Sequence, residues 1–96
     1  MMADGTLTRI VVITNPQGLH ARPADAFVKT ASRYESRIEV IKDGERVDGK
    51  SILAVLTLAA VEGTPLELEV TGPDAQAALD ALADLVLRNF DENETV

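Results

Sequence analysis

The sequence predicts an α+β domain in which a four-stranded antiparallel sheet carries three helices on one face. Strand-like and helix-like patterns follow one another in the order β-α-β-β-α-β-α, each expected helix has one apolar stripe, and each expected strand has one apolar face. The chain has 96 residues, the size of one domain, and contains no repeat or linker. We therefore expect a single domain over residues 1–96, with a polar tail at residues 91–96.

The first strand and the first helix should be separated by a loop rich in turn residues. Residues 9–13, RIVVI, form a β-branched run typical of a strand, and residues 14–19, TNPQGL, are interrupted by proline and glycine. A helix should follow over about residues 21–34. Pro23 fits only its first turn, where a missing N–H is not needed, so the helix should begin at or just after His20. The expected inward stripe comprises Ala24, Phe27, Val28, Ala31 and Tyr34.

A β-hairpin is expected next. Residues 36–42, SRIEVIK, alternate between an apolar and a more polar face. Asp43-Gly44 is a dipeptide that two-residue hairpin turns prefer. The return strand should cover about residues 45–49, and the two strands should pair antiparallel. The expected inward residues of the hairpin are Ile38, Val40 and Val47.

A helix, a strand and a final helix complete the order. The helix within residues 49–63 should be capped at its N-terminus by Ser51, and Gly63 suits the loop beyond its end. Residues 65–71, PLELEVT, alternate as a half-buried strand does, and a helix should follow at about residues 75–89. The expected inward residues are Ile52, Val55, Leu56 and Ala59 in the first of these helices, Leu66, Leu68 and Val70 in the strand, and Ala75, Ala78, Leu79, Leu82, Leu85 and Val86 in the last helix.

The composition disfavours several classes of function. Sixteen acidic against nine basic residues give a net charge of −7, whereas nucleic-acid-binding proteins need a basic surface. The chain has no cysteine and one histidine, so we expect neither a disulfide nor a typical metal site, and no cofactor is indicated. No apolar run reaches the roughly 18–20 residues of a membrane span, and the first residues do not read as a signal peptide. We therefore expect a cytoplasmic protein without membrane insertion.

The single histidine lies at the expected start of the first helix. As the N-cap residue, His20 would lie beside backbone amides without intrahelical partners, at the positive end of the helix dipole. Arg22 adds a permanent positive charge that suits a phosphate or carboxylate, and Gly18 leaves the preceding backbone open to close approach. Together these residues suit an anion site with an imidazole at its centre. Spacing alone leaves a second interpretation open, in which His20 is a surface residue or a passive helix cap.

Two stretches of the sequence resemble one protein family. GLHARPA, residues 18–24, resembles the active-site motif of the HPr family, the histidine-containing phosphocarrier proteins of the bacterial phosphoenolpyruvate-dependent sugar phosphotransferase system. GKSILAVLTLAA, residues 49–60, resembles the second motif of that family at the expected separation. The resemblance extends over essentially residues 7–90. It implies an HPr-like open-faced β-sandwich, which agrees with the two layers predicted from the pattern.

The resemblance also implies a chemical role for the histidine. In this family enzyme I takes a phosphoryl group from phosphoenolpyruvate and passes it to Nδ1 of the histidine, here His20. The group then moves to a histidine of a sugar-specific enzyme IIA component. Arg22 would neutralise the phosphoryl group, and the backbone amides of Ala21 and Arg22 would donate to it. The chain would thus serve sugar transport as a stoichiometric carrier and not as an enzyme in the ordinary sense.

Ser51 corresponds to a serine that an ATP-dependent HPr kinase/phosphorylase modifies in many relatives. The resemblance therefore implies regulatory phosphorylation, whereas the residues alone support a helix cap worth about 1 kcal/mol. Ala54 stands where many regulated relatives have glycine, which weakens this inference. An alternative function is that of a regulatory HPr paralogue, acting in carbon catabolite or nitrogen control through phosphorylation-dependent protein binding.

An apolar surface for partner proteins is expected on the second helix. Leu53 lies off the inward stripe of this helix and should be exposed. In the HPr family the partner surface is an apolar patch on this helix, beside the histidine. The resemblance implies that the patch comprises Ile52, Leu53 and Leu56, with Lys50 and Arg22 at its polar rim.

Overall fold

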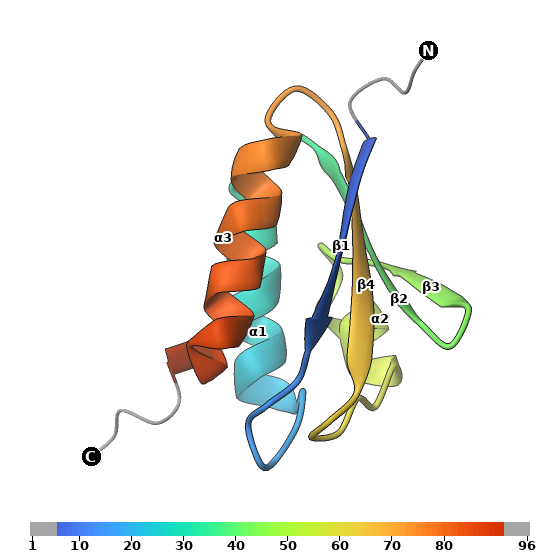
Figure 1. Cartoon of the computed structure of the whole chain (residues 1–96), viewed down its shortest axis with the longest axis vertical. Helices are drawn as coiled ribbons and strands as arrows, with labels where there is room; N and C mark the ends of the chain where they lie inside the picture. The colour runs from blue at the N-terminus through green and yellow to red at the C-terminus, as the bar shows by residue number, and fades with distance from the viewer. Residues whose placement is uncertain (1–5, 92–96) are drawn as a thin grey trace.

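A computed structural model of the protein describes residues 6–91, and within this range the elements follow the predicted order (Figure 1). A short 3₁₀ turn follows the last helix. The predicted polar tail lies outside the described residues, apart from Asp91. The elements are β1 (Thr6–Val12), α1 (Ala21–Ala31), β2 (Arg37–Lys42), β3 (Glu45–Asp48), α2 (Ile52–Thr57), β4 (Pro65–Thr71), α3 (Ala75–Leu87) and the turn η1 (Asn89–Asp91).

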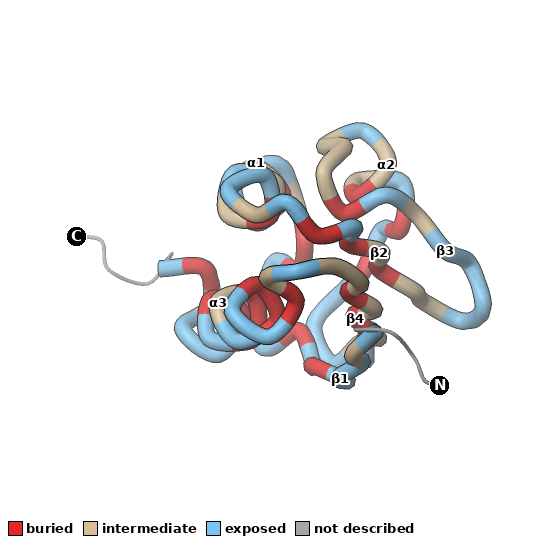
Figure 2. The backbone as a smooth tube through the Cα atoms, turned by 90° about the horizontal axis from the view of Figure 1, so that it is seen from above, coloured by how far each residue is buried: buried red, intermediate tan, exposed pale blue. Residues whose placement is uncertain are grey.

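The four strands of the described range form one antiparallel sheet in the order β1-β4-β2-β3. β4 pairs with both β1 and β2, and its register places Val70 between Leu7 and Ile38. The helices cover one face of the sheet, and the other face is open (Figures 1 and 2). The predicted fold, an open-faced β-sandwich of one sheet and one helical layer, is confirmed.

The core lies between the sheet and the helices, where Figure 2 shows buried segments of both layers facing each other. Each residue predicted to point inward from β2, β4 and α3 is buried. Burying a valine, leucine or isoleucine side chain stabilises a fold by about 1.5–3 kcal/mol. A shift of one residue in strand register would turn the apolar side chains of β2 and β4 to the open face, so the alternation determines which residues pair. The residues concerned are Ile38, Val40, Leu66, Leu68, Val70, Ala75, Ala78, Leu79, Leu82, Leu85 and Val86.

The first helix ends earlier than the sequence predicts. α1 ends at Ala31, whereas the apolar stripe suggested a helix to Tyr34. The amides of Arg33 and Tyr34 bond to carbonyls three residues back, at 3.1 and 3.2 Å, and such bonds tighten and terminate a helix. Tyr34 still packs against the core from the turn that follows.

The second helix is also shorter, and the prediction that Ala59 points inward is wrong. α2 ends at Thr57, Leu58 is buried, and Ala59 is exposed with a φ of 49°. This left-handed residue turns the chain, and the carbonyl of Ala60 then accepts a hydrogen bond from the amide of Leu19 at 2.8 Å. A contact with a distant part of the chain therefore accompanies the end of this helix.

The boundaries of two other elements shift by a few residues. β1 covers Thr6–Val12 where a strand at residues 9–13 was expected, because its first three residues pair with the end of β4. α3 ends at Leu87, before the expected residue 89, since Asn89 already has a φ of 54° and cannot continue the helix.

The hairpin matches its prediction closely. β2 and β3 pair antiparallel, and the two turn residues Asp43 and Gly44 have φ values of 50° and 82°. Positive φ at both central positions is the requirement of a type I′ turn, and an aspartate–glycine pair meets it at low cost.

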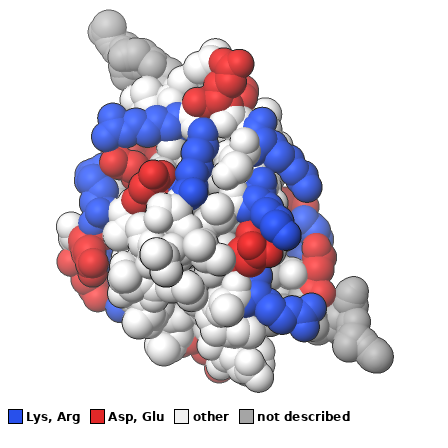
Figure 3. Space-filling model, turned by 180° about the vertical axis from the view of Figure 1, so that it is seen from behind, with Lys and Arg blue, Asp and Glu red and all other residues white. Residues whose placement is uncertain are grey.

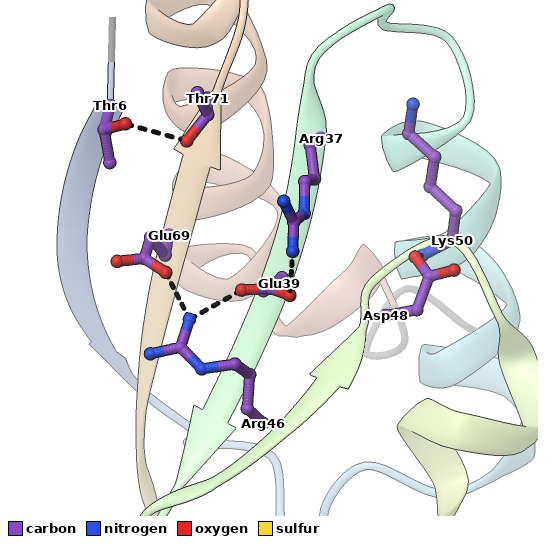
Figure 4. A network of polar contacts seen from close by, with 8 residues as sticks. All are labelled: Thr6, Arg37, Glu39, Arg46, Asp48, Lys50, Glu69 and Thr71. Atoms are coloured by element: carbon purple, nitrogen blue, oxygen red, sulfur yellow. Dashed lines mark hydrogen bonds and ion pairs between the residues drawn. The ribbon is translucent and has the colours of Figure 1, made fainter. Parts of the chain in front are cut away.

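Ion pairs link three strands across the open face of the sheet (Figure 4). The guanidinium of Arg46 on β3 donates to Glu39 on β2 at 2.6 Å and also to Glu69 on β4, and Arg37 donates to Glu39 at 3.0 Å. The hydrogen bond from Arg46, followed by that from Arg37, holds the pKa of the Glu39 carboxyl below its usual range against the opposing effect of burial. The network favours the same neighbours in the sheet, β4, β2 and β3, as the pairing of the strands does.

Hydrogen bonds to Asp74 hold the connection between α1 and β2 against the start of α3. Its carboxylate accepts hydrogen bonds from the amides of Glu35 and Ser36, both at 2.9 Å, and from the Ser36 hydroxyl at 2.5 Å. That hydroxyl in turn accepts from the amide of Asp74 at 3.2 Å. The Ser36 hydroxyl, followed by the Glu35 amide, keeps the pKa of Asp74 below its usual range. This contact therefore favours the ionised carboxylate.

Candidate functional site

The loop that leads to α1 is held by a buried asparagine. Asn15, with 2% of its surface exposed, donates from Nδ2 to the backbone carbonyl of Gly18 at 2.7 Å. Its backbone carbonyl accepts a hydrogen bond from the Gly18 amide at 3.0 Å. The amide of Leu19 is bonded in turn to the carbonyl of Ala60. Buried polar side chains that are hydrogen-bonded give a segment a defined conformation. These bonds thus fix the conformation of the loop that places His20 at the start of α1.

Gly18 is needed at its position for two reasons. Its φ is 74°, a left-handed conformation that favours glycine, and a Cβ there would lie 2.5 Å from the carbonyl oxygen of Ala60 and 2.9 Å from Cα of Val61. The sequence suggested that Gly18 leaves the backbone open to the approach of an anion. In the structure, the segment after α2 occupies that space, so the glycine joins two loops of the protein.

His20 is the N-cap residue of α1, as predicted. Its backbone is extended, with φ −86° and ψ −165°, and its carbonyl accepts the first helical hydrogen bond from the amide of Ala24 at 2.9 Å. Its side chain is half-buried and makes no capping hydrogen bond to the first turn of α1. The interpretation of His20 as a passive helix cap is therefore not supported.

The first turn of α1 offers backbone donors beside the imidazole. Pro23 lies in this turn, as predicted; it is buried and has no N–H to contribute. The amides of Ala21 and Arg22 are thus the N–H groups of the first turn, where a helix has no carbonyl one turn earlier to accept from them. The helix dipole adds roughly half a positive charge at this end.

Arg22 is exposed and borders a depression of about 490 Å³ between α1, α2 and η1. Its guanidinium forms no ion pair with any residue of the range 6–91, and the carboxylate of Asp25, which lines the same depression, is paired with Lys29 at 3.1 Å. A permanent charge beside the helix start is therefore available to an anion. The depression is lined by Ala21, Arg22, Asp25, Ala26, Ile52 and Phe90.

The two sequence motifs meet at this depression. Ser51 is the N-cap residue of α2, as predicted, and its hydroxyl accepts a hydrogen bond from the amide of Ala54 at 3.3 Å. The next residue, Ile52, lines the depression together with Arg22. Ser51 is itself partly exposed. The candidate regulatory serine and the candidate anion site thus lie on neighbouring helix starts.

The outer surface of α2 matches the expected apolar patch in part. Leu53 is 74% exposed, as predicted, whereas Ile52 and Leu56 are partly buried and pack against the core. Figure 3 shows an uncharged area on the face opposite to that of Figure 1, bordered by basic and acidic side chains. Lys50, expected at the rim, donates from Nζ to the carbonyl of Tyr34 at 2.6 Å, so its side chain links the segment before α2 to the segment after α1.

Sequence reasoning missed two residues of this region. Asn15 was treated only as part of a loop, although an asparagine three residues before a glycine is a common turn pattern. Phe90 was given no role, yet it is 5% exposed and lines the depression from the turn after α3. It is four residues after Val86 and so continues the apolar spacing, but it lies just beyond the expected end of that helix at about residue 89.

The described residues offer no group of three or more histidine, aspartate, glutamate or cysteine side chains that could share a metal ion. None of the helices between residues 6 and 91 is long and apolar enough to cross a bilayer.

Comparisons with known proteins identify the family. Residues 7–87 match the family model described as the PTS HPr component phosphorylation site. The phosphocarrier protein HPr of Neisseria meningitidis serogroup A is 44% identical over 88 residues, which cover 92% of this chain and 99% of that protein. That of Pseudomonas aeruginosa is 47% identical, covering 88% of this chain and 94% of the relative.

A solved structure agrees with these matches. The crystal structure of HPr-C-His from Thermoanaerobacter tengcongensis superposes with a TM-score of 0.87 at 40% identity, covering 91% of this chain and 98% of that one. Sequence and fold therefore lead to the same conclusion: the chain belongs to the HPr family of phosphocarrier proteins.

Proposed function

We propose that this protein accepts a phosphoryl group on His20 from enzyme I and passes it to enzyme IIA components. The observation that carries the proposal is the position of the imidazole, which lies at the start of α1 without capping it, beside an arginine that has no ion-pair partner among residues 6–91. Family membership supports the same chemistry. The partners are those of a phosphoenolpyruvate-dependent sugar phosphotransferase system, which operates at the cytoplasmic side of the membrane.

The transfer step needs only groups that this site contains. The lone pair of Nδ1 on the neutral ring attacks the phosphorus atom, the new N–P bond forms, and the bond to the donor breaks with its electron pair returning to the donor. The phosphoryl oxygens then lie near the amides of Ala21 and Arg22 and the Arg22 guanidinium. No proton has to move if Nε2 keeps its hydrogen throughout.

The electrostatics suit a carrier that must also release its cargo. The helix terminus stabilises an anion by about 0.3–1 kcal/mol, or about 2 kcal/mol in a partly buried position. A charge-assisted hydrogen bond from Arg22 adds about 1.5–3 kcal/mol. Together these terms compensate the added negative charge without trapping it, so that transfer onward to a second histidine remains easy.

Incubation with enzyme I, Mg²⁺ and phosphoenolpyruvate tests the proposal. The wild-type protein should gain the mass of one phosphoryl group, and the gain should disappear in acid because phosphohistidine is acid-labile. His20→Ala should gain nothing, whereas Ser51→Ala, which leaves the imidazole in place, should be labelled like the wild type. Failure of the wild-type protein to gain the group would refute the proposal.

Regulation at Ser51 is a second proposed function, favoured by the position of its hydroxyl. Ser51 is partly exposed at the start of α2, and the next residue, Ile52, lines the depression beside Arg22. A phosphate there would add negative charge next to the surface formed by Ile52, Leu53 and Leu56 and would change which partners bind. A role mainly in carbon catabolite or nitrogen control is the corresponding alternative to sugar transport.

An ATP-dependent HPr kinase/phosphorylase should place an acid-stable phosphate on Ser51. The label should be absent from Ser51→Ala and present on His20→Ala, which separates this reaction from transfer by enzyme I. Equal labelling of Ser51→Ala and the wild type would show that another residue is the acceptor.

A further inference from the structure

The turn after α3 has an unusual backbone. Asn89, Phe90 and Asp91 have φ values of 54°, 57° and 62°, so three successive residues other than glycine are left-handed. Asparagine and aspartate adopt this conformation at modest cost, but a bulky residue such as phenylalanine rarely does. Strained backbone of this kind persists only when the surrounding contacts enforce it, and it is common near functional sites.

Contacts on both sides hold the turn. The hydroxyl of Thr14 donates to the side-chain oxygen of Asn89, which ties the turn to the loop that ends at His20. The amide of Asp91 donates to the carbonyl of Arg88 at 2.9 Å. The Arg88 guanidinium binds both oxygens of the Asp91 carboxylate at 3.2 Å. The turn is therefore fixed relative to α3 and to the loop before α1.

The consequence of the turn is the burial of Phe90. Leu87, the last residue of α3, is 78% exposed, whereas Phe90 is 5% exposed. The left-handed segment directs the ring to the wall of the depression that Ala21 and Arg22 line. Figure 1 shows this turn at the same end of the molecule as the start of α1.

We propose that Phe90 is a positioning residue for phosphoryl transfer. Phe90 lines the same depression as Ala21 and Arg22, η1 packs against α1, and the Thr14–Asn89 bond supports the preceding loop, so one strained turn adjoins both segments that meet at His20. The ring itself does not touch the transferred group. It fixes the direction of the Nδ1 lone pair and the amides of Ala21 and Arg22, and small errors in such alignment are costly to reaction rates.

The inference rests on the proposed function, and single-turnover transfer from phosphorylated enzyme I tests it. Phe90→Ala should lower the maximal rate constant at least tenfold and leave the half-saturating concentration of the carrier within about twofold. Leu87→Ala is the matched control, since it removes a large apolar side chain from the exposed end of the same helix. Phe90→Leu, which keeps most of the apolar volume, should restore most of the rate.

The hydrolysis of isolated phosphorylated protein gives a second readout without any partner. Phe90→Ala should change the half-life of the phosphohistidine because Arg22 and the first-turn amides lose their alignment with the group. A fold that is merely less stable would not alter this rate while the protein remains folded, as monitored by circular dichroism. If Phe90→Ala does not fold, Thr14→Val, which removes the bond to Asn89 and keeps the ring, should show the same loss of rate.

Each outcome decides a different claim. Rates within twofold of the wild type for folded Phe90→Ala, or for Thr14→Val where it replaces that variant, would overturn the positioning role and leave the proposed function intact. A rise confined to the half-saturating concentration would make Phe90 a docking residue and overturn the inference as well. If the wild type accepts no phosphoryl group, the proposed function and the inference fail together.

Discussion

Replacing Gly18 with alanine tests the geometry that brings His20 to the start of α1. The new Cβ would lie 2.5 Å from the carbonyl oxygen of Ala60 and 2.9 Å from Cα of Val61. Both are backbone atoms, which cannot move aside by rotating a side chain. The φ of 74° adds a second cost because the left-handed region disfavours any residue with a Cβ.

The two costs can be assigned separate magnitudes. The left-handed conformation destabilises an L-residue other than glycine by roughly 1–2 kcal/mol. Forcing an extra methyl group into an occupied space costs about 1–3 kcal/mol. The sum, about 2–5 kcal/mol, is a large fraction of the roughly 5–15 kcal/mol that stabilises a typical domain.

Urea denaturation followed by circular dichroism measures the loss, and Gly44→Ala provides the matched control. Gly44 has a φ of 82°, but among residues 6–91, its two chain neighbours aside, no atom lies within 4 Å of the position a Cβ would take. This variant therefore carries the conformational cost without the collision. The difference between the two variants should be about 1–3 kcal/mol in the free energy of unfolding.

Phosphoryl transfer should separate the two variants as well. Gly18→Ala should slow the labelling of His20, because relief of the collision displaces the loop before α1, whereas Gly44→Ala should be labelled at the wild-type rate. Equal destabilisation of the two variants would contradict the account, since it would mean that the approach of Ala60 and Val61 does not constrain this loop.

Three further predictions concern other parts of the molecule. Ser51→Ala should lower the free energy of unfolding by about 0.5–2 kcal/mol in urea denaturation, and Ser51→Asp should restore most of it, since aspartate is an equally good N-cap. Stability should fall in acid as Asp74 becomes protonated: its pKa is lowered in the folded state, so its contribution is complete above the pKa of the unfolded chain and is lost as the pH drops through the folded value. Denaturation at several acidic pH values should show that the free energy of unfolding declines less steeply for Asp74→Asn than for the wild type. Parallel curves would show that the Asp74 carboxylate does not contribute to the loss of stability in acid. Arg22→Ala should reduce the rate of His20 phosphorylation about 10–100-fold with Arg22→Lys intermediate, as stopped-flow transfer would measure, and an unchanged rate would show that the guanidinium does not contact the transferred group.

The parts of the fold that follow from local sequence could be predicted. The alternation in β4 identifies its buried face, the Asp43-Gly44 pair identifies the hairpin turn, and Pro23 identifies the first turn of α1. In each case a few neighbouring residues determine the backbone conformation, so no knowledge of distant contacts is required.

Predictions failed where distant contacts decide the structure. The apolar spacing of α2 continues to Ala59, but the helix stops earlier because the chain turns to bring the Ala60 carbonyl to the Leu19 amide. The same contact explains the glycine at position 18, which the sequence assigned to the approach of a ligand. Neither contact leaves a periodic pattern in the sequence.

The candidate site divides in the same way. Its residue types, His20 beside Arg22 and ahead of Pro23, could be predicted from one motif, and helix geometry placed them at the start of α1. Whether the His20 side chain caps the helix could be decided only from the side-chain geometry. Phe90 needed the whole fold, because it reaches the site from the other end of the chain through a left-handed turn.

Locating the phosphoryl group directly tests the central claim. The protein with ¹⁵N-labelled histidine, incubated with enzyme I and phosphoenolpyruvate, should show a ¹⁵N–³¹P coupling at Nδ1 of its single imidazole, His20. The coupling should vanish after mild acid treatment. An unphosphorylated imidazole, or a phosphate attached to any other residue, would contradict the assignment of His20 as the carrier of the phosphoryl group.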